Sequence, residues 1–139
     1  MTDYIKISQL VNAYAHFADR REPQKQAELF TTDAIVEVYQ GEKLVQTLKG
    51  RNELKEAFSG LKQYEKTTHI NGQSTFEIND SNASGETYCL AHHLWTEQEQ
   101  RKLMIMSIRY EDTFIKEQDK WLFSKRKLII DWTDTKPNQ

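Results

Sequence analysis

The first 22 residues carry apolar side chains at three- and four-residue spacing, which predicts an amphipathic helix and the turn that closes it over 4–22. Asp19 falls near the apolar face at the end of this helix, where the helix dipole disfavours a carboxylate. It can pair with Arg21 at the surface, or it can point into the interior together with Tyr14. The apolar stripe consists of Ile7, Leu10, Val11, Tyr14 and either Phe17 or Ala18.

The following segment predicts short helices around a hairpin. Pro23 is tolerated in the first turn of a helix, and Gly41 lies between two apolar runs, one of them rich in β-branched residues. The predicted elements are a helix over 23–30, strands over 35–39 and 43–48, and a third helix that begins at Asn52 as its N-cap.

From residue 66 onward the pattern changes to long strands in which apolar and polar residues alternate. Helices first and long antiparallel strands afterwards indicate an α+β fold, with the helices covering the concave face of a strongly curved, mostly antiparallel sheet. The expected strands cover 67–78, 83–96, 102–116 and 121–131, and a polar tail follows over 133–139.

Two charged residues, Asp112 and Arg126, interrupt apolar faces of the last two strands. A turn at 118–119 places them opposite one another, where unlike charges attract and each buried charge finds a partner. We expect a structural ion pair; the alternative is that Arg126 anchors an anionic substrate. The face that contains Arg126 is expected to include Leu122, Leu128, Ile130 and Trp132.

The composition limits the possible classes of protein. A length of 139 residues predicts one domain over 1–139. The net charge is −2 and basic residues are scattered among acidic ones, so nucleic acid is not an expected partner. Cys89 is the only cysteine, which excludes an intramolecular disulfide. A signal peptide and an apolar run of about 18 residues are both lacking, so we expect a cytoplasmic protein without a membrane partner.

Histidines are the first candidates for chemistry. His69 lies within the first long strand, and the consecutive His92 and His93 point to opposite faces of the second. His93 shares its face with the small residues Cys89 and Ala91, which leave room for a cavity. We therefore expect His93 to face that cavity.

Several short motifs, taken in order, resemble the SnoaL-like family of the nuclear transport factor 2-like superfamily. The resemblance covers nearly the whole chain and implies a cone-shaped α+β barrel with a deep pocket. The motifs are YAHFAD at 14–19, LFTTDA at 29–34, a Gly50 that precedes a helix ending in AF, HIN at 69–71, ASGETYCLAHH at 83–93, RYED at 109–112, and W-x-x-x-x-R at 121–126.

The resemblance also implies an acid–base site. Scytalone dehydratase and bile-acid dehydratase use an Asp–His pair as general base, which corresponds here to Asp19 and His69. The bile-acid enzyme has a tyrosine five residues before the aspartate, as in Tyr14, and His93 best matches a second polar residue from the next strand. Scytalone dehydratase carries a tyrosine where this chain has Ala18, so its substrate placement does not transfer. Related folds include polyketide cyclases, ketosteroid isomerases and proteins without known catalysis, so the fold alone does not determine the function.

These residue types suit proton transfer. A carboxylate bonded to one imidazole nitrogen fixes the tautomer and leaves the other nitrogen as a base near neutral pH. Tyr14 can donate to a developing oxyanion, and a protonated His93 can give a proton to a leaving hydroxyl. We therefore predict that Asp19 and His69 lie within roughly 2.6–3.2 Å of one another. Substrate contacts are expected from Phe17, Tyr110, Arg126 and Trp132.

The function predicted from the sequence is that of a lyase or isomerase without a metal or other cofactor, acting on a small, ring-containing hydrophobic substrate. Three alternatives remain. Asp19, His69 and His93 could form a two-histidine, one-carboxylate metal site, although no tight ligand spacing supports it. Cys89 could act as a nucleophile, although nothing specific activates its thiol. The chain could also bind a ligand, or assemble with partners, without catalysis.

Self-association is expected as well. The convex face of such a sheet is exposed, and the alternation places Tyr88, Leu90 and His92 on one strand face and Phe123 on another. Exposed apolar surface tends to be covered by a partner, so we predict a homo-oligomer, either a dimer or a trimer.

Overall fold

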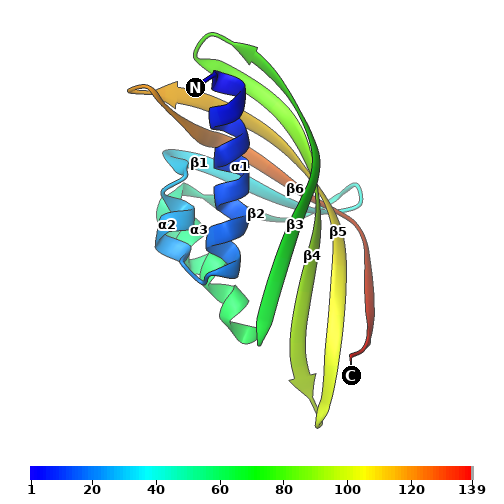
Figure 1. Ribbon diagram of the computed structural model, residues 1–139. Helices are drawn as coiled ribbons and strands as arrows, with labels where there is room; N and C mark the ends of the chain where they lie inside the picture. The colour runs from blue at the N-terminus through cyan, green and yellow to red at the C-terminus, as the bar shows by residue number, and fades with distance from the viewer. Residues whose placement is uncertain (139) are drawn as a thin grey trace.

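The computed structural model describes residues 1–138, in which helices pack on one face of a six-stranded sheet (Figure 1). The helical elements are α1 (Asp3–Asp19), α2 (Pro23–Ala27), α3 (Gly50–Phe58) and a 3-10 helix (Ser59–Gln63). The strands are β1 (Phe30–Gln40), β2 (Lys43–Lys49), β3 (Lys66–Asn79), β4 (Asn82–Glu97), β5 (Gln100–Glu117) and β6 (Lys120–Pro137).

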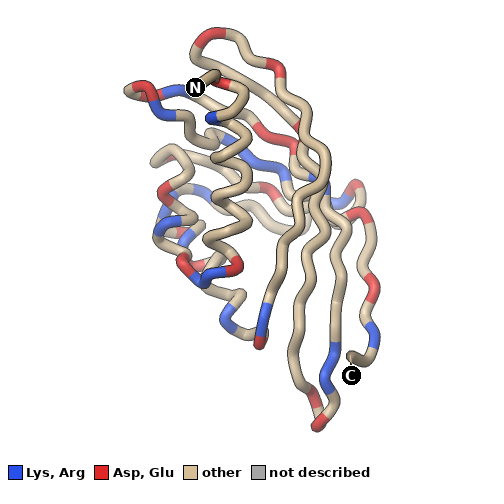
Figure 2. The backbone as a smooth tube through the Cα atoms, viewed as in Figure 1, with Lys and Arg blue, Asp and Glu red and all other residues tan. Residues whose placement is uncertain are grey.

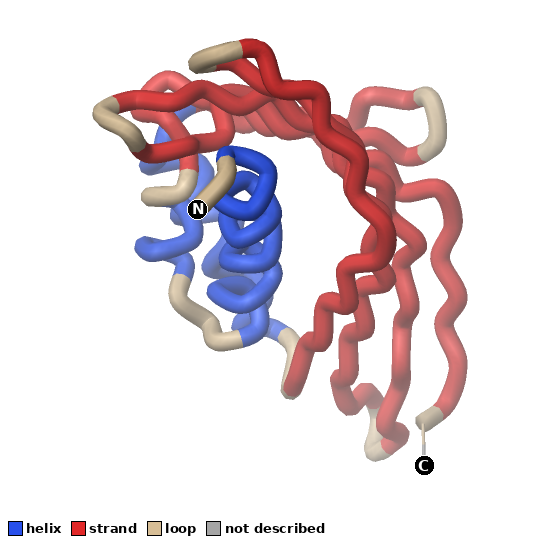
Figure 3. The backbone as a smooth tube through the Cα atoms, turned by 45° about the horizontal axis from the view of Figure 1, so that its top comes forward, coloured by secondary structure: helices blue, strands red, loops and turns tan. Residues whose placement is uncertain are grey.

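The strands form a single sheet in the order β2-β1-β6-β5-β4-β3. Neighbouring strands are antiparallel except β1 and β6, which run parallel. The sheet curves strongly around the helices, and α1 lies across its concave side (Figure 3). The α+β fold with a curved, mostly antiparallel sheet is therefore confirmed.

Helix α1 buries the apolar stripe that its sequence predicts. Thr2 is its N-cap, and the Thr2 hydroxyl accepts a hydrogen bond of 3.2 Å from the Ile5 amide. The middle of the helix carries no charged residue, and charges gather at its two ends (Figure 2). The buried residues are Ile7, Leu10, Val11, Tyr14 and Ala18, so Ala18 rather than Phe17 completes the stripe.

Three predicted boundaries were wrong. Helix α2 ends at Ala27, and strand β1 already begins at Phe30. Asn52 lies inside α3, whose N-cap is Lys49; the Glu53 carboxylate accepts a 2.9 Å hydrogen bond from the Lys49 amide. The polar segment 133–137 is the end of β6, because it pairs with residues 102–106 of β5.

Strand β6 contains two β-bulges that change which side chains face inward. The register with β5 shifts at Ser124 and again at Asp131, so each of these residues is an extra one. A bulge breaks the alternation of faces. Phe123 is consequently buried against Phe30, with 4.8 Å between the ring centroids, and Trp132 lies on the outer face.

These bulges contradict three predictions made from strict alternation. Leu122 pairs with Ile115, one position beyond the inner pair of Phe114 and Phe123, so it does not share a face with Arg126. Phe123 does not belong to the exposed outer surface, and Trp132 does not share a face with Arg126. Within residues 1–138, none of the helices is long and apolar enough to cross a membrane.

Candidate active site

A cavity of about 270 Å³ lies between the helices and the inner face of the sheet. Four of the residues expected in the site line it, namely Tyr14, His69, His93 and Tyr110. Most of the remaining wall is apolar and comes from all parts of the chain: Ala18, Val36, Val38, Leu48, Ala57, Phe58, Leu61, Ala91, Met106, Ile108, Leu128 and Ile130.

The C-terminal end of α1 brings Asp19 against strand β3. The Nδ1 atom of His69 lies 2.7 Å from Oδ1 of Asp19, as predicted from the sequence. Two further groups donate to the same carboxylate: the His69 amide at 2.8 Å and the Thr67 hydroxyl at 3.0 Å. Asp19 is therefore held by both the side chain and the backbone of the strand that carries its partner.

These contacts determine the protonation of the pair. Partial burial raises the pKa of Asp19, but the hydrogen bonds from His69 and Thr67 outweigh it and leave the pKa below its usual range. An ionised Asp19 can only accept, so Nδ1 of His69 carries the proton and donates it. The Nε2 atom of His69 is then left with a free lone pair.

Arg21 supports this pair without contacting Asp19 directly. Its guanidinium donates to the Thr67 hydroxyl at 3.2 Å and to the Tyr64 carbonyl at 3.0 Å. Arg21 itself has a positive φ of 58° at the turn that ends α1. The turn thus directs a cation to the residue that donates to Asp19, and the expected surface pair of Asp19 with Arg21 is not formed.

His93 faces the cavity and His92 faces outward, where its Nδ1 lies 3.0 Å from the Thr68 carbonyl. Burial lowers the pKa of His93, and its Nδ1 lies 3.3 Å from the Met104 carbonyl. A carbonyl only accepts, so Nδ1 carries the proton and Nε2 is an acceptor in the neutral ring. The expectation that a protonated His93 supplies a proton therefore does not match its surroundings at neutral pH.

Two of the tyrosines that line the cavity, Tyr14 and Tyr110, are buried, and burial raises the pKa of each. Both phenols consequently remain protonated and able to donate. The ring of Tyr14 is held edge-on by Phe58 at 5.6 Å and by Tyr110 at 5.7 Å between centroids. This packing leaves Tyr14 little freedom to rotate.

Arg126 lies behind these tyrosines and not in the cavity lining. Its side chain is 0% exposed, and it donates to Asp112 at 2.8 and 3.2 Å, as the predicted structural pair requires. Its Nη1 has no hydrogen-bond partner, but the guanidinium carbon lies 4.2 Å from the Tyr14 ring centroid and 3.5 Å from that of Tyr110. The aromatic faces stabilise this cation.

Two other expected substrate contacts also lie outside the cavity. Phe17 is half-buried on α1 and packs with His16 and Lys25. Trp132 is on the outer face because of the bulge at Asp131. The expectation that Phe17, Arg126 and Trp132 contact a ligand in this cavity is therefore not supported by their positions.

Cys89 is buried outside the cavity lining, and burial raises the pKa of its thiol to about 11. A thiol with this pKa is protonated at neutral pH and is a poor nucleophile. Within residues 1–138, no group of three or more His, Cys, Asp or Glu side chains is arranged to hold a metal ion. Asp19, His69 and His93 in particular do not converge on one point in this way.

Four polar residues of the cavity were missed by the sequence analysis, and Gln26 is the most deeply buried of them. Gln26, on α2, is 2% exposed and lines the cavity. Helix α2 has five residues, which is too short to give a periodic signal. Three polar residues nearer the exposed surface also line the cavity: Gln46, Gln63 and Tyr64.

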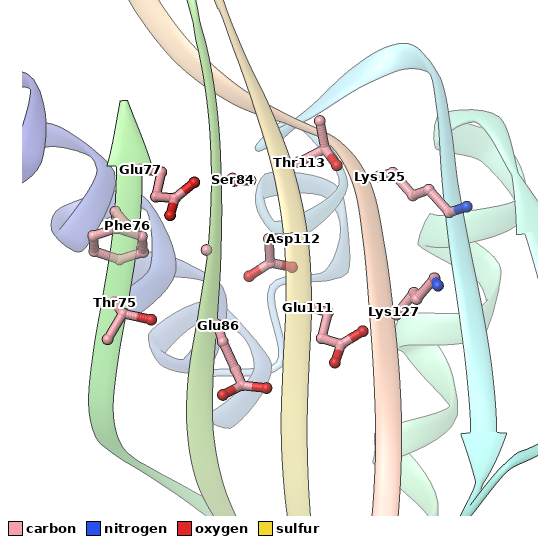
Figure 4. Close-up of a pocket in the computed structure, with 11 residues that line it drawn as sticks. Thr75, Phe76, Glu77, Ser84, Glu86, Glu111, Asp112, Thr113, Lys125 and Lys127 are labelled. Carbon is pink, nitrogen blue, oxygen red and sulfur yellow. The ribbon is translucent and has the colours of Figure 1, made fainter. Parts of the chain in front are cut away.

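A larger but shallow hollow of about 710 Å³ lies mainly on the outer face of the sheet (Figure 4). Glu86 and Glu111 line one side of it, and Lys125 and Lys127 line the other. Its lining contains no histidine, and its charged residues are partly or fully exposed except Asp112, which is buried and paired with Arg126. We therefore consider the smaller inner cavity as the candidate active site.

The fold and this cavity define an α+β cone protein in which a carboxylate–histidine pair lies beside an internal cavity. The model of the SnoaL-like domain matches residues 1–127, so the chain belongs to the SnoaL-like family of the nuclear transport factor 2-like superfamily. No curated protein sequence matches the chain closely enough to indicate a relative.

Solved structures share the fold at low sequence identity. A protein from Novosphingobium aromaticivorans provisionally identified as a scytalone dehydratase has a TM-score of 0.81 and 24% identity, over 95% of this chain and 86% of its own. A type 2 hexachlorocyclohexane dehydrochlorinase has a TM-score of 0.78 and 17% identity, over 98% of this chain and 88% of its own. A protein of unknown function from Nostoc punctiforme, with a cystatin-like fold, has a TM-score of 0.72 and 21% identity, over 93% of this chain and 91% of its own.

Proposed function

We propose that this protein is a lyase or isomerase of the dehydratase or cyclase type that uses His69 as its general base. The observation that carries the proposal is the 2.7 Å contact between Asp19 and Nδ1 of His69, in a histidine that lines an internal cavity. The contact orients the ring and favours its protonated form after the base has accepted a proton. The dehydratase and dehydrochlorinase names of two structural neighbours are consistent with this chemistry.

The proposed reaction begins with proton abstraction from a carbon next to a carbonyl group. Nε2 of His69 takes the proton, and the electrons of the C–H bond form the enolate, whose oxygen accepts a hydrogen bond from Tyr14. In an elimination, the enolate electrons expel a β-hydroxyl group, which takes the proton from His69 and leaves as water. In an isomerisation, His69 returns the proton to another carbon.

His93 has a different proposed role from that of the base. Its Nε2 accepts a hydrogen bond from the substrate hydroxyl and so positions the leaving group.

The substrate is a small, ring-containing hydrophobic molecule, because most of the cavity wall is apolar and the cavity volume is slightly below the roughly 300–1,000 Å³ of typical ligand pockets. The chemistry uses only side chains of this chain and no metal or other cofactor.

The proposal can be tested by deuterium exchange at the carbon next to the carbonyl of 1-indanone, followed by proton NMR in D2O. We expect the wild-type protein to accelerate the exchange, and His69→Ala to remove roughly a factor of 10²–10⁴, the usual contribution of a general base. Asp19→Asn should reduce the rate less, because the base remains but is less well oriented.

The control for this experiment is His92→Ala, which removes a histidine from the outer face and should leave the exchange rate unchanged. Melting temperatures of all variants verify that they are folded. Equal exchange rates for the wild-type protein and His69→Ala would contradict the proposed function. Binding of 1-indanone without any exchange would favour the alternative of a non-catalytic ligand-binding domain.

We also propose that the protein self-associates through the outer face of its sheet. Ile70, Leu90 and Trp132 are exposed on that face and lie in one row across the strands. Exposed apolar side chains that lie side by side favour contact with another surface.

A further inference from the structure

Gln26 carries the most deeply buried side-chain amide of the cavity, and the described structure shows no hydrogen bond for it. It is 2% exposed and lines the cavity, whereas the other two glutamines of the lining, Gln46 and Gln63, are exposed. The backbone of Gln26 is satisfied within the helix: its amide donates to Glu22 and its carbonyl accepts from Leu29. The side-chain amide is thus the free group.

The amide of Gln26 is not one of the fully enclosed polar atoms without a partner, which among the described residues belong to Asn71 and Arg126, so it keeps contact with the space of the cavity and can bond to what fills it. The nearby protein offers little compensation, since the wall is mostly apolar and the imidazole of His69 is already bonded to Asp19. A ligand oxygen in the cavity would restore the missing bond. Gln26 is therefore placed to bind a ligand.

The charge of the cavity adds a second constraint. Its described lining contains no Lys, Arg, Asp or Glu. Two cations contact lining residues from outside the cavity, and both already have partners: Arg126 is paired with Asp112, and Arg21 donates to the Tyr64 carbonyl and the Thr67 hydroxyl. Asp19, whose pKa is lowered, contributes negative charge on the far side of His69. A carboxylate or phosphate in this cavity would lose its water without gaining a counter-ion.

We propose that Gln26 anchors the substrate through a hydrogen bond from its amide to an uncharged oxygen, and that the cavity selects neutral ketones or alcohols against the corresponding anions. This inference rests on the proposed function only in that the ligand is a substrate; its claim about binding by Gln26 is independent of catalysis. Because α2 and β3 carry Gln26 and His69 separately, the anchor and the base lie on different elements of one cavity.

The test measures binding of three probes with the same ring system by isothermal titration calorimetry: indane, 1-indanone and indane-1-carboxylate. We expect the wild-type protein to bind 1-indanone more tightly than indane, and to bind the carboxylate at least tenfold more weakly than 1-indanone. In Gln26→Met, which keeps the length of the side chain, affinity for 1-indanone should fall about three- to tenfold, the usual effect of one hydrogen bond. Affinity for indane should stay the same or rise.

The matched control is Gln24→Met on the same helix, because Gln24 is exposed and bonded to Glu28 at 3.1 Å. This variant should bind all three probes as the wild-type protein does. If Gln26→Met does not fold, Gln26→Leu and the probe selectivity of the wild-type protein serve the same purpose. Unchanged affinity of the folded Gln26 variant for 1-indanone, tight binding of the carboxylate, or no binding of 1-indanone at millimolar concentration would overturn the inference.

The outcomes separate this inference from the proposed function. Binding of 1-indanone that depends on Gln26 but shows no His69-dependent exchange would remove the catalytic assignment and retain the anchor. If deuterium exchange depends on His69 but Gln26→Met binds 1-indanone as tightly as the wild-type protein does, the catalytic assignment is retained and the anchor is removed.

Discussion

At the scale of single residues, the two cavity histidines differ in the atom that each Nδ1 faces. His69 donates to the carboxylate of Asp19, which can stabilise an imidazolium, whereas His93 faces the Met104 carbonyl, which carries no full charge. The same side chain is therefore suited to accept a proton in one place and to remain neutral in the other.

The surroundings of His93 give a prediction for stability against pH. Burial lowers the pKa of His93 in the folded state, while the unfolded chain has the ordinary value of about 6.5. Above that pH both states are neutral; as the pH falls below it, the unfolded chain binds the proton first and the free energy of unfolding decreases. We expect His93→Leu to flatten the fall in melting temperature between about pH 6.5 and pH 5.

His92→Leu, on the outer face, is the control and should leave this part of the curve as in the wild-type protein. Asp19 acts in a different window: its folded pKa is lowered, so its contribution to stability is present above about pH 3.9 and is lost as the pH falls through the folded pKa. A melting curve for His93→Leu that follows the wild-type pH dependence would show that His93 is not responsible.

At the scale of elements, the sheet depends on close contacts as well as on hydrogen bonds. Gly85 on β4 is opposite Phe76 on β3. A Cβ atom at Gly85 would overlap the Phe76 ring and lie 2.5 Å from the Thr75 carbonyl oxygen, which belongs to the backbone and cannot move aside. At Gly72, a Cβ would meet its nearest neighbour, Tyr88, at an ordinary 3.6 Å.

We therefore expect Gly85→Ala to destabilise the protein by about 1–3 kcal/mol, the usual cost of overpacking. Gly72→Ala, also in the sheet and with room for the methyl group, should change the free energy of unfolding far less. Urea unfolding followed by circular dichroism measures both. Equal stabilities of the two variants would mean that the strands separate to admit the methyl group.

The elements also show which parts of the fold the sequence could predict. The stripe on α1 follows from the fixed period of 3.6, so it was predicted. The pair of Asp112 and Arg126 was predicted as well, but the register set by the turn alone would place Lys125 opposite Asp112, and the bulge at Ser124 brings Arg126 there. The contact between Asp19 and His69 was predicted because each was hard to explain alone, and the family resemblance indicated the same pair. Its catalytic role stays a prediction.

The errors arose where a fixed period does not apply. One extra residue at each bulge of β6 moves Phe123 inward and Trp132 outward, and no residue type at Ser124 or Asp131 announces a bulge. Gln26 was missed for a related reason, since one and a half turns of helix do not define a face. The correct positions of these residues depend on contacts between distant segments.

At the scale of the whole molecule, the outward position of Trp132 adds to the outer apolar surface. Ile70 pairs with Leu90, Leu90 with Ser107, and Ser107 with Trp132, so these four residues form a row across β3, β4, β5 and β6. Tyr88 lies two residues from Leu90 on the same face and is also exposed. Helices cover the opposite face of the sheet, which leaves this row free for contact with another molecule (Figure 3).

We expect light scattering at micromolar concentration to give a mass above that of one chain. Leu90→Lys should reduce the mass toward the monomer, because it places a charge in the centre of the row, where a stable interface of about 800 Å² per partner would exclude water. Leu44→Lys is the matched control, since Leu44 is equally exposed but lies on β2, two strands away from the nearest strand of the row. A wild-type protein that remains monomeric, or an equal loss of mass in both variants, would argue against an interface at this row.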